Sequence, residues 1–338
     1  MKPSENPYAG WEGPLHTDLY EWHNILNGGG PAYGRLQDEL ISDIESRWAT
    51  LNPKLIIDVG AASGHSSIRL ANKYPKSIVW ATDLNPRALE VIEYRQGKGD
   101  IDLEARVCEG VITVEDARML RDFYKFAGSM PSNVVVAELD MTEIDRHRED
   151  VDMISGNQSV HWLLRQGGVD RLGEFLRAAR NVLKDGHPIA FNMNLGYCKP
   201  VNPESLDRHM DRHPFRRRYL DIVALALQER GESPEYSLPT PGATAELVTD
   251  LMRSASFEPL VTRDVVVPYP LGVVIQFAYH MLPRSFGLMD NMKHPMADAE
   301  RREFLVGCRD EALKKYVPED SHRQFEHSVN VQFVGRAA

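Results

Sequence analysis

The fold is decided by residues 55–64, which read Leu-Ile-Ile-Asp-Val-Gly-Ala-Ala-Ser-Gly. The short apolar run before the glycines predicts a buried β-strand. The next residues, 66–74, place Ile68, Leu70 and Ala71 on one side of a helix. A strand, a glycine turn and a helix form the opening unit of a doubly wound α/β sheet. Glycines in that turn let the backbone and the helix N-terminus approach a ligand closely.

The same alternation continues along the chain. A helix is expected from Pro86 through Val91, with Asn85 as its N-cap, and further helices over 169–183 and 244–254. Six more apolar runs predict strands, at 77–81, 134–140, 151–157, 188–193, 259–267 and 328–334. The sequence therefore predicts an α/β fold with a doubly wound, Rossmann-like, seven-stranded sheet.

Three segments interrupt this alternation and divide the expected domains. Residues 1–50 are predicted as an N-terminal helical, aromatic lid, before a core domain over 51–195. Residues 196–238 are predicted as a helical cap insertion. Residues 239–338 return to the core and carry a second helical insertion over 270–322, with helices expected at 272–285 and 299–316.

Composition limits the classes of partner. The 338 residues contain 39 Lys and Arg against 49 Asp and Glu, a net charge of −10, which argues against a broad cationic groove for nucleic acid. No run of 18 apolar residues and no apolar leader occur, so we expect neither a membrane span nor a secretory signal. We therefore expect a cytoplasmic location. We expect a small-molecule substrate, no nucleic-acid or membrane partner, and a monomer or homodimer.

Two carboxylates point to the ligand. Asp58 lies two residues before Gly60, and the turn lacks the G-x-G-x-x-G pattern that cradles a pyrophosphate. A carboxylate at that point suits a cationic amino group instead. Asp83 ends the second strand about 20 residues later, where an acid can accept both hydroxyls of a ribose.

Four ordered motifs carry a resemblance to a known family: DVGAASG at 58–64, ATDLNP at 81–86, AELDM at 137–141 and DMISGNQSVHWL at 152–163. With them, roughly residues 50–338 resemble the class I S-adenosylmethionine-dependent methyltransferases. The last motif, with RAARNVLKDG at 177–186, is most similar to the trans-aconitate and biotin-precursor methyltransferase branch. The resemblance implies S-adenosylmethionine as the cofactor and a role in small-molecule biosynthesis, such as secondary metabolism.

The resemblance also implies site residues. The glycine turn would line the methionine moiety, Asp83 the ribose, and Asp140 and Met141 the adenine, with Asn157 and Gln158 beside the sulfonium. Ala62 stands where the family usually has a glycine, and the N-P-P-Y signature of amide and base amines is absent, which argues against nucleobase methylation. The implied cofactor-binding set is Asp58, Gly60, Ala61, Ala62, Gly64, Asp83, Leu84, Asp140, Met141, Asn157 and Gln158.

Catalysis is assigned to Asn157, His161 and Tyr20. His161 is the general-base candidate for a hydroxyl or amine acceptor, whereas a carboxylate or enolate needs no base. The residues expected to contact the substrate are Trp22, His161, Trp162 and Tyr197. Aromatic faces attract a sulfonium cation, so Tyr20 and Trp22 are candidates to wall the cofactor. No metal site is expected, because His209 and His213 lack a third ligand in register.

Three functions remain open. The first is methyl transfer to a small acidic or amphipathic metabolite by in-line attack at the sulfonium carbon, giving S-adenosylhomocysteine. The second is cyclisation of S-adenosylmethionine itself to azetidine-2-carboxylate, which releases methylthioadenosine and is similar to the azetidine-2-carboxylate synthases. The third is a non-catalytic protein that binds S-adenosylmethionine.

Overall fold

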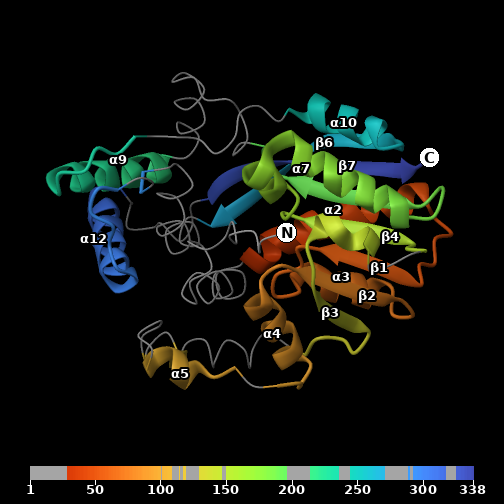
Figure 1. The fold of residues 1–338 in the computed structure, drawn as a ribbon, viewed down its shortest axis with the longest axis horizontal. Coiled ribbons are helices and arrows are strands. Elements are labelled where there is room, and N and C mark those ends of the chain that lie inside the picture. Colours follow the sequence, from red (N-terminus) through yellow and green to blue (C-terminus); the bar gives the residue numbers. More distant parts are fainter. Residues whose placement is uncertain are drawn as a thin grey trace. The chain divides into compact units, whose positions relative to one another are not determined.

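A computed structural model of the chain divides into two compact units (Figure 1). The core unit comprises Met1–Leu195, Ala243–Val267 and Val329–Ala338, and the cap unit comprises Gly196–Gly242 and Pro268–Ser328. The structure describes residues 29–99, 101–108, 114, 117–118, 129–146, 150–195, 214–235, 244–270, 288–289, 292–316 and 325–338.

A seven-stranded mixed sheet, in the order β3-β2-β1-β4-β5-β7-β6, organises the core unit. The first five strands pair in parallel, and β7 runs antiparallel to β5. The chain leaves β1 in one direction for β2 and β3, and then returns to the other side of β1 with β4. The gap between β1 and β4 is thus a topological switch point, where open α/β sheets bind ligands. The strands are β1 Leu55–Val59, β2 Ile78–Asp83, β3 Val134–Glu138, β4 Met153–Asn157, β5 Pro188–Met193, β6 Phe257–Pro270 and β7 Phe325–Ala337.

Helices cover both faces of this sheet, as the predicted fold class requires. Val334 of β7 packs in one cluster with Leu40 and Ile44 of α2, whereas a side chain at the next residue, Gly335, would meet Met252 of α10. Because successive residues of a strand point to opposite faces, α2 and α10 lie on opposite sides of the sheet. The helices of the core unit are α2 Gly29–Arg47, α3 His65–Lys73, α4 Pro86–Arg95, α5 Leu103–Cys108, η1 Met141–Arg146 (a 3-10 helix), α7 His161–Val182 and α10 Ala245–Ser254.

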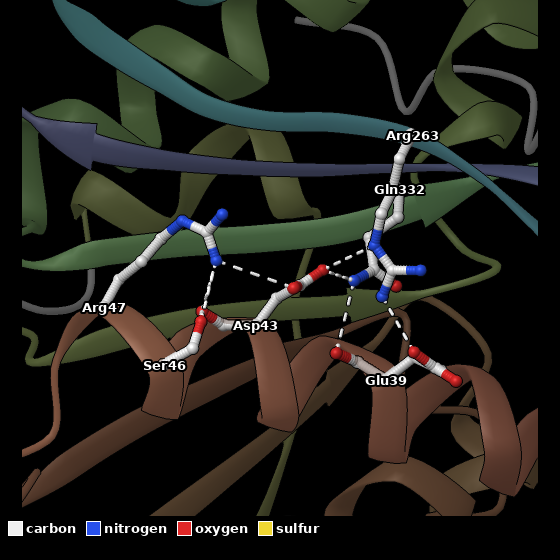
Figure 2. Close-up of polar contacts among 6 residues, drawn as sticks. All are labelled: Glu39, Asp43, Ser46, Arg47, Arg263 and Gln332. Carbon is white, nitrogen blue, oxygen red and sulfur yellow. Dashed lines mark hydrogen bonds and ion pairs between the residues drawn. The ribbon is translucent and has the colours of Figure 1, made fainter.

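The helix α2 is held on the sheet by a polar cluster at β6 and β7 (Figure 2). The Arg263 guanidinium donates to Asp43 Oδ2 at 2.9 Å and to Glu39 Oε2 at 2.8 Å. Gln332 donates to the same Asp43 carboxylate and to the Glu39 carbonyl oxygen. Because Asp43 is joined to two strands at once, α2 is part of the core. The described portion of the predicted lid is therefore a packed helix.

The direction of α2 matters for the site. At the middle of α2, Gln37 donates to Ser155 Oγ in the middle of β4 at 3.1 Å, and just after the end of α2, Trp48 Nε1 donates to the Gly186 carbonyl oxygen at 2.7 Å. Gly186 precedes β5, at the amino edge of the parallel strands. The helix therefore begins near the carboxyl edge of the sheet, where the switch point opens.

The predicted helices are confirmed with changes at their ends. α4 begins at Pro86 and α10 ends at Ser254, as expected. α7 begins at His161, eight residues before the predicted start at Val169, because a kink at Gly167 and Gly168 interrupts it and hides the first turns from the periodic pattern.

The cap unit contains the helices α9 Pro214–Glu229 and α12 Asp298–Tyr316, which pack against each other. Their contact buries Tyr219 and Val223 of α9 against Leu305 and Ala312 of α12. α12 confirms the helix predicted at 299–316, and the helix predicted at 272–285 lies outside the described residues. Across the described residues of both units, no helix combines the length and apolarity that crossing a bilayer requires.

Candidate functional site

The glycine turn joins β1 to α3 and sets the floor of the candidate site. Its backbone has positive φ angles at Gly60 (63°), Ala62 (46°) and Gly64 (84°). A Cβ at Gly60 would stand 2.3 Å from the Ser159 Cβ, so only a glycine lets the loop after β4 lie directly on the turn. That close approach unites the ends of β1 and β4 at the switch point.

Ala62 occupies the left-handed region that favours glycine. An L-residue in that region costs about 1–2 kcal/mol. Its amide N–H donates to Asp83 Oδ2 at 2.9 Å. That hydrogen bond fixes the turn to the end of β2 and helps to hold the strained conformation.

Asp58 is fully buried beneath the turn. Its Oδ2 accepts a hydrogen bond from Ser67 Oγ of α3 at 2.5 Å, whereas Oδ1 has no partner among the described residues. Burial raises the pKa of Asp58 from its ordinary value of 3.8 to about 7, and the nearby charge of Asp83 adds to the increase, while the Ser67 bond opposes it. An unpartnered carboxylate oxygen in this position suits a cation, which would restore the charged form.

Asp83 ends β2 beside Asp58. Its Oδ1 accepts from the Asn85 amide at 2.9 Å and its Oδ2 from the Ala62 amide, so the carboxylate is held rigidly. Burial raises the pKa of Asp83, and these backbone hydrogen bonds oppose the increase. Each oxygen keeps acceptor capacity, because a carboxylate offers about four lone-pair sites. The next residue, Leu84, is half-buried.

The loop after β3 lies over the same turn. The Met141 Cε would be 3.5 Å from a Cβ at Gly60. Asp140 Oδ1 accepts from the amide and hydroxyl of Thr142, at 2.9 and 2.8 Å, and its Oδ2 pairs with Arg171 of α7. The structure thus gives Asp140 an anchoring role between this loop and α7, and its contact with adenine stays a prediction.

Four amide side chains, Asn157, Gln158, Asn192 and Asn330, form a cluster at the carboxyl edge, which we call the amide cluster. Asn192 Oδ1 accepts from the Gln158 backbone amide at 2.9 Å and from Gln158 Nε2 at 2.8 Å, and Asn192 Nδ2 donates to Asn157 Oδ1 at 2.9 Å. Gln158 Nε2 also donates to Asn330 Oδ1 at 2.7 Å. The strands β4, β5 and β7 are therefore joined at this edge through side chains as well as backbone.

His161 and Trp162 begin α7, close behind the amide cluster in sequence. The imidazole is 5% exposed, and the two rings lie next to each other, with centroids 5.3 Å apart at a 31° tilt. Both residues follow Ser159, which contacts the glycine turn. Their membership of the site and their chemical roles remain predictions.

His65, which the sequence analysis did not select, begins α3 directly after Gly64. Burial lowers the pKa of His65 to about 3, and the charges of Arg95 and Arg69 lower it further. The imidazole is therefore neutral, and its Nε2 has no partner among the described residues. Its position directly after the last glycine of the turn was the sequence signal that could have identified His65 as a residue of the site.

The structure brings together residues from the ends of four parallel strands and from the segments that follow them: Asp58, Gly60, Ala61, Ala62 and Gly64 at β1, Asp83 and Leu84 at β2, Met141 after β3, and Asn157, Gln158 and His161 at β4. Three further candidates, Tyr20, Trp22 and Tyr197, lie outside the described residues. The same holds for His209 and His213. Among the residues that are described, no group of three or more metal-ligating side chains occurs.

S-adenosylmethionine fits these residues in chemical terms. Its ammonium matches the unpartnered oxygen of Asp58, and its ribose hydroxyls match the rigid acceptor at Asp83. A pyrophosphate fits less well, because two neighbouring carboxylates, the buried Asp58 and the half-buried Asp83, would repel it.

The chain was compared with protein families, curated proteins and solved structures. No protein-family model and no curated protein matches the chain. Among solved structures, the geranyl diphosphate C-methyltransferase of Streptomyces coelicolor, in complex with S-adenosyl-L-homocysteine, is 12% identical over 90% of this chain and 80% of its own, with a TM-score of 0.39. A phosphoethanolamine N-methyltransferase of Haemonchus contortus, in complex with S-adenosyl-L-methionine, is 12% identical over 99% of this chain and 60% of its own, with a TM-score of 0.46.

A 16S rRNA adenine N1-methyltransferase of Catenulisporales acidiphilia is 12% identical over 88% of this chain and 93% of its own, with a TM-score of 0.41. Similarity at this level says nothing about the substrate of this chain, which depends on the residues of its own site. The sheet order, the reversed β7 and the glycine turn at the switch point define the architecture directly. The chain has the seven-stranded Rossmann-like fold of the class I S-adenosylmethionine-dependent methyltransferases.

Proposed function

We propose that this protein is an S-adenosylmethionine-dependent enzyme that transfers the methyl group to a small metabolite, with S-adenosylhomocysteine as the second product. The observation that carries the proposal is the pair of carboxylates at the ends of β1 and β2. Asp58 offers one unpartnered buried oxygen, and Asp83 offers a rigid acceptor held by two backbone amides. Together they match the two polar ends of a single cationic nucleoside.

In this proposal the cofactor supplies an electrophilic methyl group, and the protein supplies placement. Asp58 would hold the ammonium, Asp83 the ribose hydroxyls, and Met141 would cover the adenine side of the glycine turn. Held between these groups, the sulfonium would face the loop after β4, which carries Asn157 and Gln158. Alignment of two reacting atoms is the main contribution an enzyme can make to an in-line displacement.

The acceptor would bind beyond the sulfonium, near the start of α7. His161 is the proposed general base when the nucleophile is a hydroxyl or an amine, because it is a titratable side chain at that edge. α2 begins at the same edge, which supports a role for the preceding Tyr20 and Trp22 in walling the cation. We also propose that Trp162 and Tyr197 contact the acceptor. A soluble monomer or homodimer in the cytoplasm suits such an enzyme.

Product analysis tests the proposal. The protein is incubated with methyl-labelled S-adenosylmethionine, with and without a low-molecular-weight metabolite extract as the source of acceptor. Methyl transfer predicts labelled acceptor and S-adenosylhomocysteine only when the extract is present. Methylthioadenosine formed without extract would instead establish the cyclisation to azetidine-2-carboxylate. Tight binding without any product would establish a binding protein, and absence of binding would overturn all three.

A further inference from the structure

The amide cluster fixes the orientation of the Gln158 side chain. A backbone N–H can only donate, so the atom of Asn192 that lies 2.9 Å from the Gln158 amide nitrogen must be its oxygen. The same oxygen lies 2.8 Å from one end of the Gln158 side-chain amide, which must therefore be the nitrogen. The orientation of each amide thus follows from one unambiguous donor, although amide oxygen and nitrogen atoms are otherwise hard to distinguish.

Both hydrogens of Gln158 Nε2 are then used. One bonds to Asn192 Oδ1 and the other to Asn330 Oδ1 at 2.7 Å. Reversing the Gln158 amide would place its oxygen against two other oxygens, so the side chain cannot turn over without losing both bonds. Gln158 Oε1 accepts no hydrogen bond from any described residue and remains available as an acceptor.

Several observations place Gln158 at the carboxyl edge of the sheet, beside the glycine turn. Gln158 is half-buried and precedes Ser159, whose side chain lies against Gly60 of the glycine turn. Its backbone is in the left-handed region, with φ at 59°, a strained conformation that such sites retain when the surroundings fix it. Asn192 and Asn330 are both fully buried, and Asn330 Nδ2 has no partner in the part of the chain that is described. The cluster therefore leaves one buried donor, Asn330 Nδ2, uncompensated among the described residues, which costs stability.

We infer that Gln158 is a binding residue whose carbonyl oxygen faces the sulfonium and its methyl group, and that Asn192 and Asn330 are positioning residues that keep it so. The inference rests on the proposed function. A carbonyl oxygen at this position favours a cation or a hydrogen-bond donor at the reacting centre. It disfavours an anion there, because two like partial charges would meet.

Two analogues test this without knowledge of the acceptor. Sinefungin carries a carbon-bound amine where S-adenosylmethionine carries its methyl group, whereas S-adenosylhomocysteine has neither charge nor donor at that point. We define the selectivity as the Kd of S-adenosylhomocysteine divided by the Kd of sinefungin, measured by calorimetry. Because a hydrogen bond to a charged group is involved, Gln158→Leu and Asn330→Leu should each lower the selectivity about tenfold.

Two further variants separate positioning from structure. Asn330→Asp keeps the acceptor oxygen and replaces the unpartnered Nδ2 by a second oxygen, whose negative charge also favours a cation, so it should keep or raise the selectivity. Asn133 directly precedes β3, at the opposite, amino edge of the sheet, and its side-chain amide donates to the Ser77 carbonyl oxygen. Asn133→Leu removes that amide and should leave the selectivity unchanged. Equal losses of affinity for both analogues in Asn330→Leu, or an unchanged selectivity, would overturn the inference. If neither analogue binds the wild-type protein, the proposed function itself has failed.

Discussion

The substitution Asp58→Asn should change how the stability of the protein depends on pH. The pKa of Asp58 is about 7 in the folded protein against 3.8 ordinarily, mainly because the carboxyl is buried. Between these two values the folded state retains a proton that the unfolded state has lost. The free energy of unfolding therefore falls as pH rises through this window, and the contribution of Asp58 is complete only below pH 3.8.

The magnitude follows from the difference of about 3 between the two pKa values, which corresponds to about 4 kcal/mol. An asparagine carries no charge, so Asp58→Asn should remove this loss. It should stabilise the unliganded protein by up to about 4 kcal/mol at pH 8, and by much less at pH 5. The hydrogen bond from Ser67 can be kept, since the asparagine carbonyl oxygen is also an acceptor.

The assay is urea unfolding, followed by circular dichroism at pH 5, 6, 7 and 8, for the wild type and the variant. Glu246→Gln is the control, because hydrogen bonds from its own backbone amide and from the Thr244 side chain lower the pKa of Glu246. Its contribution is present above its ordinary pKa of 4.5 and is lost only below that, so it should leave the slope between pH 5 and 8 unchanged. A stability difference between wild type and Asp58→Asn that does not grow with pH would refute the reasoning.

Three other substitutions test the site and its support. Asp83→Ala should weaken S-adenosylhomocysteine binding on the order of a hundredfold in calorimetry, since it removes the charged acceptor of two hydroxyls; an unchanged Kd would exclude Asp83 from the ribose site. Ala62→Gly should stabilise the protein by about 0.5–1 kcal/mol in urea unfolding, because glycine relieves the strain at φ 46° but adds entropy to the unfolded chain. A loss of stability would show that the backbone is unstrained there. Arg263→Met should cost about 1 kcal/mol, since its ion pairs with Glu39 and Asp43 are partly exposed, and less in 1 M NaCl. An effect that does not depend on salt would assign the loss to packing.

Much of the fold could be predicted because its signals are local. The strands at 55–59 and 188–193 have the predicted bounds, since each is a short apolar run ended by turn residues. The start of α7 could not be predicted, because the glycine pair at 167–168 breaks its periodicity. α5 was also missed, as its six residues are too few to show a helical period.

The two carboxylates of the candidate site could be predicted, since their distances from the glycine turn are fixed along the chain. The amide cluster could not, because Asn192 and Asn330 meet Gln158 only through the pairing of β4, β5 and β7. A signal was available: Asn192 is a polar residue in the otherwise apolar run PIAFNM, and a buried amide requires partners. The sequence alone could not say which partners these would be.

The central claim is that Asp58 and Asp83 together hold one cationic nucleoside at the switch point. A crystal structure with S-adenosylhomocysteine tests it most directly. We expect the ammonium on the free oxygen of Asp58 and both ribose hydroxyls on Asp83, at about 3 Å in each case. Density for the nucleoside elsewhere on the chain, or with its ribose away from β2, would contradict the claim.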